Sequence, residues 1–321
     1  MKFIFFILVL INSLSAISYD MVDTYRMFGI EEVRNKLEKE MLKKEYWEYH
    51  IKDIDVSYGY YESIRYLIIC QKDKKDIEIY DVKIKKKLFS SDVFIGKKEG
   101  DKYKEGDMRT PIGAYSLTKK LTMVDPFYGP LAFVTNYPNL YDRTQGKTGH
   151  GIWIHGLPLN PNQKRDSFTK GCIALDNINI KYIDKTIDIK QTALLINHSD
   201  IRLTTKDEIA SILSEIFKWR YQWQQNNIEQ YLSFYSKEFK NSHHKNFNSF
   251  KHYKEKIFAR GEKKDIKFFD INIIPYPHKD KTNLFKIEMR EQYSTKYHKF
   301  NGSKTLYIEL NSGKISILTE E

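Results

Sequence analysis

Two short stretches of this chain carry side chains that can do chemistry together, 150-HGIWIHGLPLN-160 and 169-TKGCIAL-175. The first holds two histidines, and the second holds Cys172, one of only two cysteines in 321 residues. A cysteine attacks as its thiolate, and a free thiol has a pKa of about 8.5, so a base must take its proton. Histidine titrates in the required range. The pattern is therefore typical of nucleophilic catalysis by a cysteine–histidine pair.

Cys172 also has two structural interpretations, as half of a disulfide with Cys70 or as a buried spectator thiol. Cys70 ends the apolar run 64-IRYLIIC-70, where a thiol behaves as a small hydrophobic group. Cys172 instead follows Lys170 and Gly171 in a polar turn. Spacing alone does not fix disulfide connectivity. The different surroundings of the two cysteines favour the catalytic interpretation.

Two histidines compete for the role of the base. His155 ends the apolar strand 152–154, a place from which a side chain can enter a site, whereas His150 follows a loop rich in Gly, Lys and Thr. We therefore assign the base to His155 and expect His150 to be a loop residue or a substrate contact. Glycine lets the backbone approach a substrate closely. The N–H groups of Gly171 and Cys172 are accordingly candidate donors to an oxyanion.

No other residues suggest a metal or a cofactor. His243 and His244 are adjacent, but no cysteine or carboxylate lies at ligand spacing from them. A solvated loop is the better interpretation of this pair. We therefore expect neither a metal nor a cofactor.

The segment that must position the cysteine and histidine is rich in strands. A β pattern begins near residue 58 and ends near residue 200, with expected strands over 64–70, 77–89, 92–97, 131–137, 151–156 and 192–197. Between them, 106-GDMRTPIGAYSL-117 places Gly, Pro and Gly just before another strand. The pattern predicts a compact, mainly β catalytic domain over residues 58–200.

The residues before this domain are charged and predict helix over 19–57. Apolar residues recur there at spacings of three and four, which gives one stripe on a helix: Ile30, Val33, Leu37 and Met41. Such a stripe must be covered by the main domain or by a second copy of the chain. The sequence leaves both open, so a homodimer through the N-terminal helix is one of the two expectations.

The residues after the β domain predict a separate α+β domain over 203–321. Thr205 and Glu208 form a capping box that begins a helix. The apolar stripe of this helix consists of Ile209, Ile212, Ile216, Trp219 and Trp223. Three β runs follow at 267–276, 284–293 and 304–319, the last with a hairpin turn at 311–313. Helices followed by an antiparallel sheet are typical of the α+β class.

The first residues and the charge indicate where the protein works. Lys2, the apolar run 3–11 and the small residues around 16–18 predict a cleaved secretory signal over 1–18, with an uncleaved anchor as the alternative. The formal net charge is +11. An exported basic protein meets anionic envelope polymers, so we expect a periplasmic protein with cell-wall material, and not nucleic acid, as its partner.

The order of these motifs resembles the L,D-transpeptidase (YkuD) catalytic domain. In this chain the motif is His155, thirteen intervening residues and then Thr169-Lys170-Gly171-Cys172. The segment 106–117 is similar to the Gly-x-x-x-Thr-Pro-x-Gly segment of that family. The resemblance covers residues 58–200 and implies a sandwich-like β fold.

The resemblance also implies an activity on peptidoglycan stem peptides. Cys172 would attack the carbonyl of the third residue and expel the terminal D-alanine, leaving a thioester. His155 would activate the thiol, and the backbone carbonyl of Gly156 would orient the imidazole. An amine acceptor would give a 3–3 cross-link, whereas water would trim a tetrapeptide to a tripeptide. Further substrate contacts are expected from a set of residues around this pair: His150, Trp153, Thr169, Lys170 and Gly171.

This chain departs from the family pattern beside the nucleophile. Lys170 stands where the family usually has histidine, Ala174 stands where it often has arginine or asparagine, and the gap after His155 is one residue shorter than usual. These changes leave the nucleophile and base intact and make cross-linking the less favoured outcome. A lysine next to the thiol also lowers a thiol pKa.

The domain order is similar to that of cell-shape L,D-carboxypeptidases, in which a nuclear transport factor 2 (NTF2)-like domain follows the catalytic domain. The aromatic residues of this C-terminal domain are expected mostly in its core, with some lining a glycan or peptide pocket. We therefore expect an L,D-carboxypeptidase. The alternatives are an L,D-transpeptidase and a wall-binding protein that does no catalysis.

Overall fold

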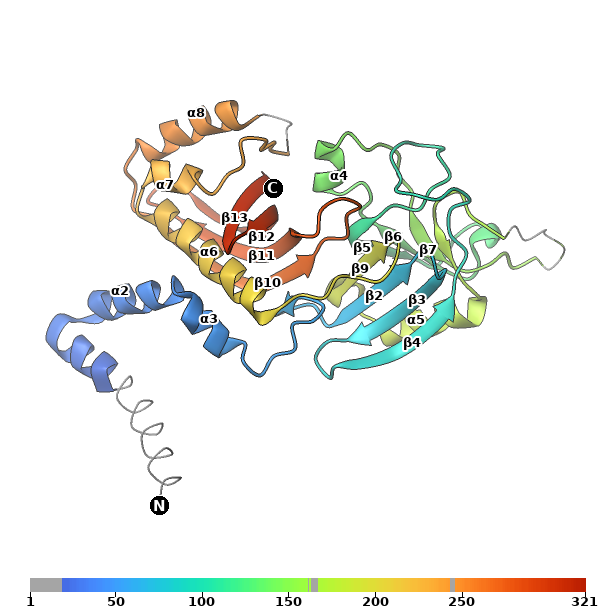
Figure 1. The fold of residues 1–321 in the computed structure, drawn as a ribbon, viewed down its shortest axis with the longest axis horizontal. Helices are drawn as coiled ribbons and strands as arrows, with labels where there is room; N and C mark the ends of the chain where they lie inside the picture. Colours follow the sequence, from blue (N-terminus) through green and yellow to red (C-terminus); the bar gives the residue numbers. More distant parts are fainter. Residues whose placement is uncertain (1–18, 161, 163–166, 243–245) are drawn as a thin grey trace, which may run out of the picture.

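The computed structural model describes residues 19–160, 162, 167–242 and 246–321. The expected leader over 1–18 and the pair His243–His244 lie outside these residues. Two sheets lie next to each other in Figure 1, and the prediction of a mainly β domain, a C-terminal α+β domain and N-terminal helices is confirmed. Within the described part of the chain, no helix is both long and apolar enough to cross a membrane.

The catalytic domain is built on an eight-stranded sheet of order β4-β3-β2-β9-β5-β6-β7-β8. Strand β5 connects its two halves, because residues 113–116 pair with β9 and residues 117–121 pair with β6. Of the expected strand over 92–97, Asp92 ends β4, and the rest forms only isolated bridges, from Phe94 to Ala174 and from Gly96 to Thr169. The strands are β2 (Tyr66–Gln71), β3 (Asp76–Asp81), β4 (Lys86–Asp92), β5 (Gly113–Leu121), β6 (Ala132–Thr135), β7 (Trp153–His155), β8 (Ile173–Ala174) and β9 (Thr192–Asn197).

The middle of strand β2, residues 67–70, is apolar, and both of its faces are buried. Successive side chains of a strand point to opposite faces. Ile68 and Cys70 point into the core of the catalytic domain, whereas Leu67 and Ile69 point into the cluster shared with the C-terminal domain. Short helices complete the catalytic domain: η1 (Pro126–Tyr128), α4 (Leu140–Thr144), α5 (Asn177–Thr186) and η2 (Ile189–Gln191).

The C-terminal domain has a five-stranded antiparallel sheet of order β1-β10-β11-β12-β13. The capping box of Thr205 and Glu208 is present, and the predicted helical stripe is buried against the sheet. Ser312 and Gly313 turn the last hairpin with φ of 49° and 76°, the left-handed conformation that such tight turns require. The elements are α6 (Lys206–Gln224), α7 (Ile228–Leu232), α8 (Phe247–Phe258), β1 (Tyr60–Tyr61), β10 (Asp265–Pro275), β11 (Leu284–Ser294), β12 (Lys299–Asn311) and β13 (Lys314–Glu320).

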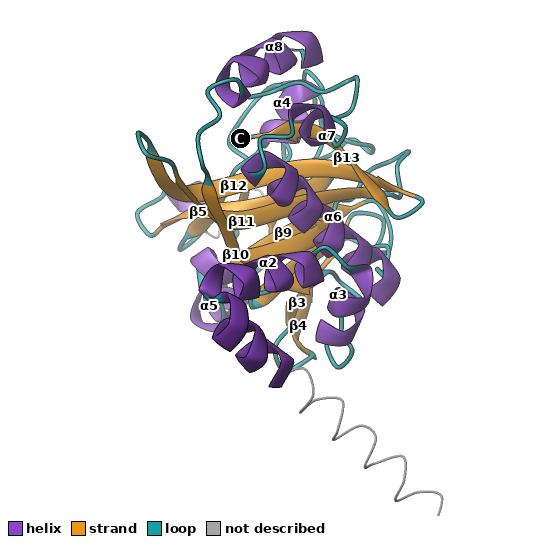
Figure 2. Cartoon of the chain, turned by 90° about the vertical axis from the view of Figure 1, so that its left-hand side faces the viewer, coloured by secondary structure: helices purple, strands orange, loops and turns teal. Residues whose placement is uncertain are grey.

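The N-terminal helices pack on the C-terminal domain and not on the catalytic sheet. Helix α3 (Lys44–His50) inserts the buried Trp47 against Phe217 of α6, with 4.9 Å between ring centroids. Figure 2 shows α2 (Ile30–Met41), α3 and α6 gathered on one side of the molecule. Ile30 and Leu37 remain exposed on α2. Cover by a second copy of the chain therefore stays a prediction.

The chain crosses between the two sheets at the start of the expected catalytic domain. Strand β1 belongs to the C-terminal sheet, where Tyr60 pairs with Ile273. The next strand, β2, belongs to the catalytic sheet. A two-residue strand carries no periodicity that could assign it to either sheet. An apolar cluster fills the interface between the domains and includes Leu67, Leu195, Tyr141, Tyr276 and Tyr307.

Candidate active site

His155 is held at the end of β7 with a defined proton position. The strand pairs with β6 on one side and β8 on the other, and the imidazole is 5% exposed. Its Nδ1 lies 2.6 Å from the carbonyl oxygen of Gly156. Because a carbonyl can only accept, Nδ1 carries the hydrogen and the neutral ring keeps an unprotonated Nε2. That nitrogen is the one able to act as a base.

Gly156 is required for its small size as well as for its carbonyl. A Cβ atom on this residue would lie 2.4 Å from Oδ1 of Asn177 and 2.7 Å from Cδ of Pro130. Asn177 in turn accepts a hydrogen bond from the N–H of Leu157 at 2.8 Å. The turn after β7 is therefore packed between α5 and the segment after η1, which fixes the carbonyl that holds His155.

Cys172 lies in a turn held by two threonine hydroxyls. Thr169 Oγ1 accepts from the N–H of Gly171 at 3.0 Å and donates to the carbonyl of Cys172 at 2.6 Å. Thr110 Oγ1 donates to the carbonyl of Gly171 at 3.0 Å. Gly171 has φ of 136°, and a Cβ there would lie 2.7 Å from the carbonyl oxygen of Arg109. Because the N–H of Gly171 is already bound to Thr169, the N–H of Cys172 is the remaining candidate donor to an oxyanion.

Burial shifts the pKa values of the pair apart, so that both groups rest uncharged. Burial raises the pKa of the half-buried Cys172 thiol above its usual value, against the lowering effects of the backbone N–H of Trp153 and the charge of Lys102. Burial lowers the pKa of His155, although its bond to Gly156 opposes this. The thiol Sγ donates to the carbonyl of Gly151 at 3.4 Å. The resting state is therefore a thiol and a neutral imidazole.

The second cysteine takes no part in the site. Cys70 is fully buried in β2, and burial raises its pKa to about 12. Cys70 and Cys172 are both free thiols. The structure therefore has no disulfide between them and places them in the different surroundings that the sequence indicated.

Cys172 and His155 line one pocket of about 230 Å³. Of the other residues expected at the site, Thr169 and Lys170 also line it, whereas His150, Trp153, Gly156 and Gly171 do not. His150 is exposed on the loop before β7. The full lining is Phe94, Met108, Phe127, Tyr128, His155, Leu157, Pro158, Phe168, Thr169, Lys170, Cys172 and Ala174.

Sequence reasoning missed the aromatic wall of this pocket. Tyr128 packs edge-on against His155, with 5.1 Å between ring centroids and an interplanar angle of 89°. It also contacts Trp153 at 5.0 Å, so Trp153 supports the wall from behind. The turn 126-PFYGP-130 was the available signal, because two prolines and a glycine around two aromatic residues fix an exposed loop.

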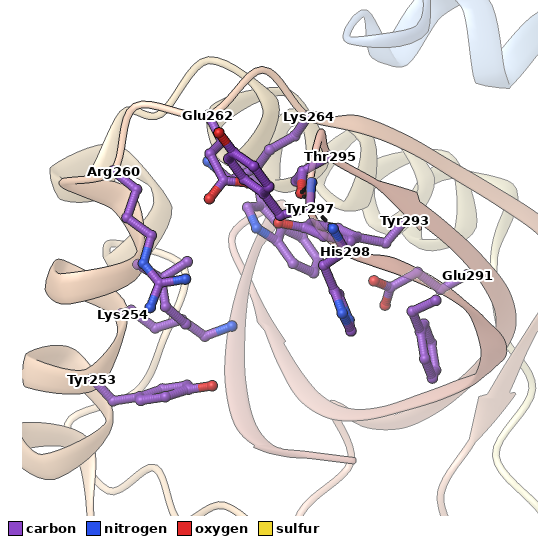
Figure 3. A pocket seen from close by; sticks show the side chains of 13 residues that line it. Tyr253, Lys254, Arg260, Glu262, Lys264, Glu291, Tyr293, Thr295, Tyr297 and His298 are labelled. Carbon is purple, nitrogen blue, oxygen red and sulfur yellow. Dashed lines mark hydrogen bonds between the residues drawn. The ribbon is translucent and has the colours of Figure 1, made fainter.

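A second pocket, of about 480 Å³, opens in the C-terminal domain (Figure 3). Lys254 from α8 faces Glu291 from β11 across it. Burial lowers the pKa of Lys254 to about 8 and raises that of Glu291. Trp223 lines this pocket, whereas Trp219 is fully buried in the core. The lining is Trp223, Tyr253, Lys254, Ile257, Arg260, Glu262, Lys264, Glu291, Tyr293, Thr295, Tyr297, His298 and Phe300.

The described residues provide no group of three or more His, Cys, Asp or Glu side chains that could hold a metal ion. The residues of the cysteine pocket are mainly aromatic and apolar around one thiol, one imidazole and one amine. The chemistry that this set can perform directly is acyl transfer through the thiol.

Comparison with known proteins defines the class of each domain. Residues 65–196 match the model of the L,D-transpeptidase catalytic domain, and residues 211–321 match that of the Cds6 C-terminal NTF2-like domain. The Escherichia coli (strain K12) protein YafK is 29% identical over 105 residues, which are 33% of this chain and 37% of YafK. The chain thus spans little more than a third of the length of that curated relative.

The particular family is defined by similarity over nearly the whole chain. The helical cell shape determining protein Pgp2 from Campylobacter jejuni is 40% identical, with a TM-score of 0.81 over 88% of this chain and 100% of that one. A point mutant of Pgp2 gives 39% identity and a TM-score of 0.82 over 88% of this chain and 99% of that one. Bd1075 of Bdellovibrio bacteriovorus is 26% identical, with a TM-score of 0.65 over 84% of this chain and 97% of that one. The chain belongs to the family of Pgp2.

Proposed function

We propose that this protein is an L,D-carboxypeptidase that trims peptidoglycan stem tetrapeptides to tripeptides. The observation that carries the proposal is that Cys172 and His155 line one pocket, with the imidazole Nδ1–H fixed on the Gly156 carbonyl. This arrangement leaves Nε2 available as a base for the thiol. The family, in which Pgp2 is a helical cell shape determinant, supports a role of this trimming in cell shape.

The first half of the reaction forms a thioester. Nε2 of His155 takes the proton of Cys172 as Sγ attacks the carbonyl carbon of the third stem residue. The N–H of Cys172 stabilises the negative oxygen of the tetrahedral intermediate. The imidazolium then gives its proton to the leaving nitrogen, the amide bond breaks and D-alanine departs.

The second half hydrolyses the thioester. His155, neutral again, takes a proton from a water molecule whose oxygen attacks the thioester carbonyl. When the intermediate collapses, the carbon–sulfur bond breaks, the imidazolium returns its proton to the sulfur, and the tripeptide leaves as a carboxylic acid. A stem-peptide amine in place of water would give the 3–3 cross-link of an L,D-transpeptidase.

We assign to Lys170 and its surroundings the selection of water, and not an amine, as the group that attacks the thioester. Its exposed ammonium lines the pocket next to the nucleophile. A fixed positive charge repels the protonated amine of an acceptor stem, whereas water is unaffected. This electrostatic argument supports trimming over cross-linking.

Digestion of purified muropeptides tests the proposal. Wild-type protein is expected to convert tetrapeptides to tripeptides plus free D-alanine, and Cys172→Ala to lose this activity. Cys70→Ser is the matched control, since it alters the other thiol, which does not line the pocket. New 3–3 dimers would overturn the carboxypeptidase in favour of the transpeptidase. Activity lost in His150→Ala and retained in His155→Ala would overturn the choice of base.

The C-terminal pocket favours a second function, binding of a wall glycan or peptide. Three basic side chains, Lys254, Arg260 and Lys264, line it against the two carboxylates of Glu262 and Glu291, and several aromatic residues complete the lining. Such a surface suits an anionic, partly apolar segment of the polymer. Binding to sacculi is expected to persist in Cys172→Ala and to be lost in Lys254→Gln. That result would support a binding function that is separate from catalysis.

We also assign the protein to the periplasm. The leader pattern over 1–18 and a wall substrate support export. Fractionation of cells is expected to place the protein in the periplasmic extract, and recovery in the cytoplasm would contradict the assignment.

A further inference from the structure

One side chain of the C-terminal domain reaches into the polar interior of the catalytic domain. Tyr276 follows the end of β10 and is 4% exposed. Its hydroxyl accepts a hydrogen bond from Nδ2 of Asn139 at 2.9 Å and donates to Oδ1 of Asp142 at 3.4 Å. Both partners belong to the capping box of α4, a catalytic-domain helix. The contact between the domains is therefore polar and directional at this point.

The same hydroxyl lies against the segment 110-TPIG-113. A Cβ atom on Gly113 would lie 2.6 Å from the hydroxyl oxygen of Tyr276. Glycine is required here because the backbone has φ of 155° and because no space remains for a side chain. The tyrosine hydroxyl thus forms part of the surface on which this end of the segment rests.

A buried charge network holds the residue just before Gly113. Asp142 pairs with Lys147 at 2.9 Å, and Lys147 pairs with Asp101 at 2.6 Å. The other oxygen of Asp101 accepts the N–H of Ile112 at 2.8 Å. Tyr276 therefore contacts the segment directly at Gly113 and indirectly through Asp142.

The opposite end of the segment holds the cysteine turn. Thr110 Oγ1 donates to the carbonyl of Gly171, and it accepts the N–H of Gly96 at 2.9 Å. Thr110 also receives a hydrogen bond at its own carbonyl from the buried Lys72. A displacement of the segment would accordingly reach the residue that precedes Cys172.

We propose that Tyr276 is a positioning residue by which the C-terminal domain fixes the geometry of the cysteine turn. The proposal rests on the role of Cys172 given above, and it assigns to the second domain a contribution to the reaction rate. Tyr276 touches no reacting atom. It acts through residues 110–113, whose placement sets that of Gly171 and hence of the nucleophile.

Tyr276→Phe in the full-length protein tests the proposal, because it removes only the hydroxyl. The matched control is Tyr307→Phe, a buried tyrosine of the same interface that packs by its ring against Tyr141 and Tyr276. Two assays are used. Steady-state kinetics on a tetrapeptide gives kcat and KM, and peptide mass spectrometry gives the rate of alkylation of Cys172 by iodoacetamide. Alkylation reports on the turn without requiring turnover.

The hydroxyl makes two hydrogen bonds, of which the one to Asp142 is long at 3.4 Å. Tyr276→Phe is therefore expected to lower kcat and the alkylation rate about fivefold each, with KM within about twofold of wild type. Tyr307→Phe is expected to change neither rate. Wild-type rates in Tyr276→Phe, equal losses in both variants, or a change confined to KM would overturn the proposal.

A second variant keeps the test decisive if Tyr276→Phe folds poorly. Asn139→Ser retains an oxygen that can cap α4 but removes the amide, which donates both to the tyrosine hydroxyl and to the carbonyl of Ala114 at 3.2 Å. It is expected to lower both rates in the same direction, and unchanged rates would count against the proposal. If Cys172→Ala kept its turnover, the proposed function would fail, while the alkylation comparison would still decide whether Tyr276 sets the geometry of the turn.

Discussion

Replacement of Thr110 by valine should damage both the stability of the catalytic domain and its chemistry. Thr110 is fully buried, and its hydroxyl makes one hydrogen bond to the Gly96 N–H and another to the Gly171 carbonyl. Valine has nearly the same shape, so the change creates no cavity. The substitution leaves the half-buried N–H of Gly96 and the buried carbonyl of Gly171 without their hydrogen-bond partner.

The structure sets the size of the expected effect. A buried polar group left without a partner costs about 1–3 kcal/mol, and the Gly96 N–H, being half-buried, falls at the low end. The free energy of unfolding should therefore fall by roughly 2–4 kcal/mol. Because the lost bond to Gly171 is adjacent to Cys172, the proposed nucleophile, kcat should fall about tenfold or more.

Urea unfolding followed by circular dichroism and steady-state trimming of a tetrapeptide measure the two effects of Thr110→Val. Thr110→Ser is the control, since it keeps the hydroxyl and loses one methyl group, at about 1 kcal/mol of stability. It should retain most of the wild-type kcat. Equal losses of kcat in the serine and valine variants would refute the reasoning, because the methyl group and not the hydroxyl would then hold the turn.

Three further predictions address the site and the fold. Burial lowers the pKa of His155 below its ordinary 6.5 and raises that of Cys172 above its ordinary value. As the pH rises, kcat/KM should therefore increase with a midpoint below pH 6.5, where the imidazole loses its proton, and then stay level to above pH 9. An increase with a midpoint above pH 6.5 would contradict a resting pair of neutral thiol and neutral imidazole. Gly156→Ala forces a Cβ to within 2.4 Å of Asn177 Oδ1, so single-turnover acylation should slow by about 100-fold, and an unchanged rate would show that the turn can move freely. Trp47→Ala, which empties a site in the C-terminal core, should lower the free energy of unfolding by about 3–5 kcal/mol in urea titrations, and a loss under about 1 kcal/mol would mean that α3 is not part of that core.

Much of the fold could be predicted because periodic apolar patterns are local signals. The stripe of α6 and its capping box were visible in the sequence, and so was the last hairpin. The placement of His155 at a strand end followed from one apolar run and one glycine. These features depend on residues that are close together in the chain, so they can be predicted from the sequence alone.

The features that could not be predicted depend on residues distant in the sequence. Tyr60 pairs with Ile273, and nothing in a two-residue strand indicates that partner. The carbonyl of Gly171 accepts a hydrogen bond from Thr110, 61 residues earlier, a contact that spacing does not reveal. Tyr128 reaches His155 only because η1 and β7 are brought together by the sheet. Long-range packing therefore decided the remaining details of the site.

The crossing of the chain between the two sheets has a consequence for how the protein is made. Glu62 and Ile271, joined by a hydrogen bond at 2.7 Å, are 209 residues apart. A ribosome must therefore synthesise the whole catalytic domain before β1 and α3 can meet their partners. Until then Trp47 and its neighbours stay exposed to water, and such surfaces bind chaperones or aggregate. One face of the catalytic sheet is uncovered for the same period, because Leu67 and Ile69 pack into the cluster shared with the C-terminal domain.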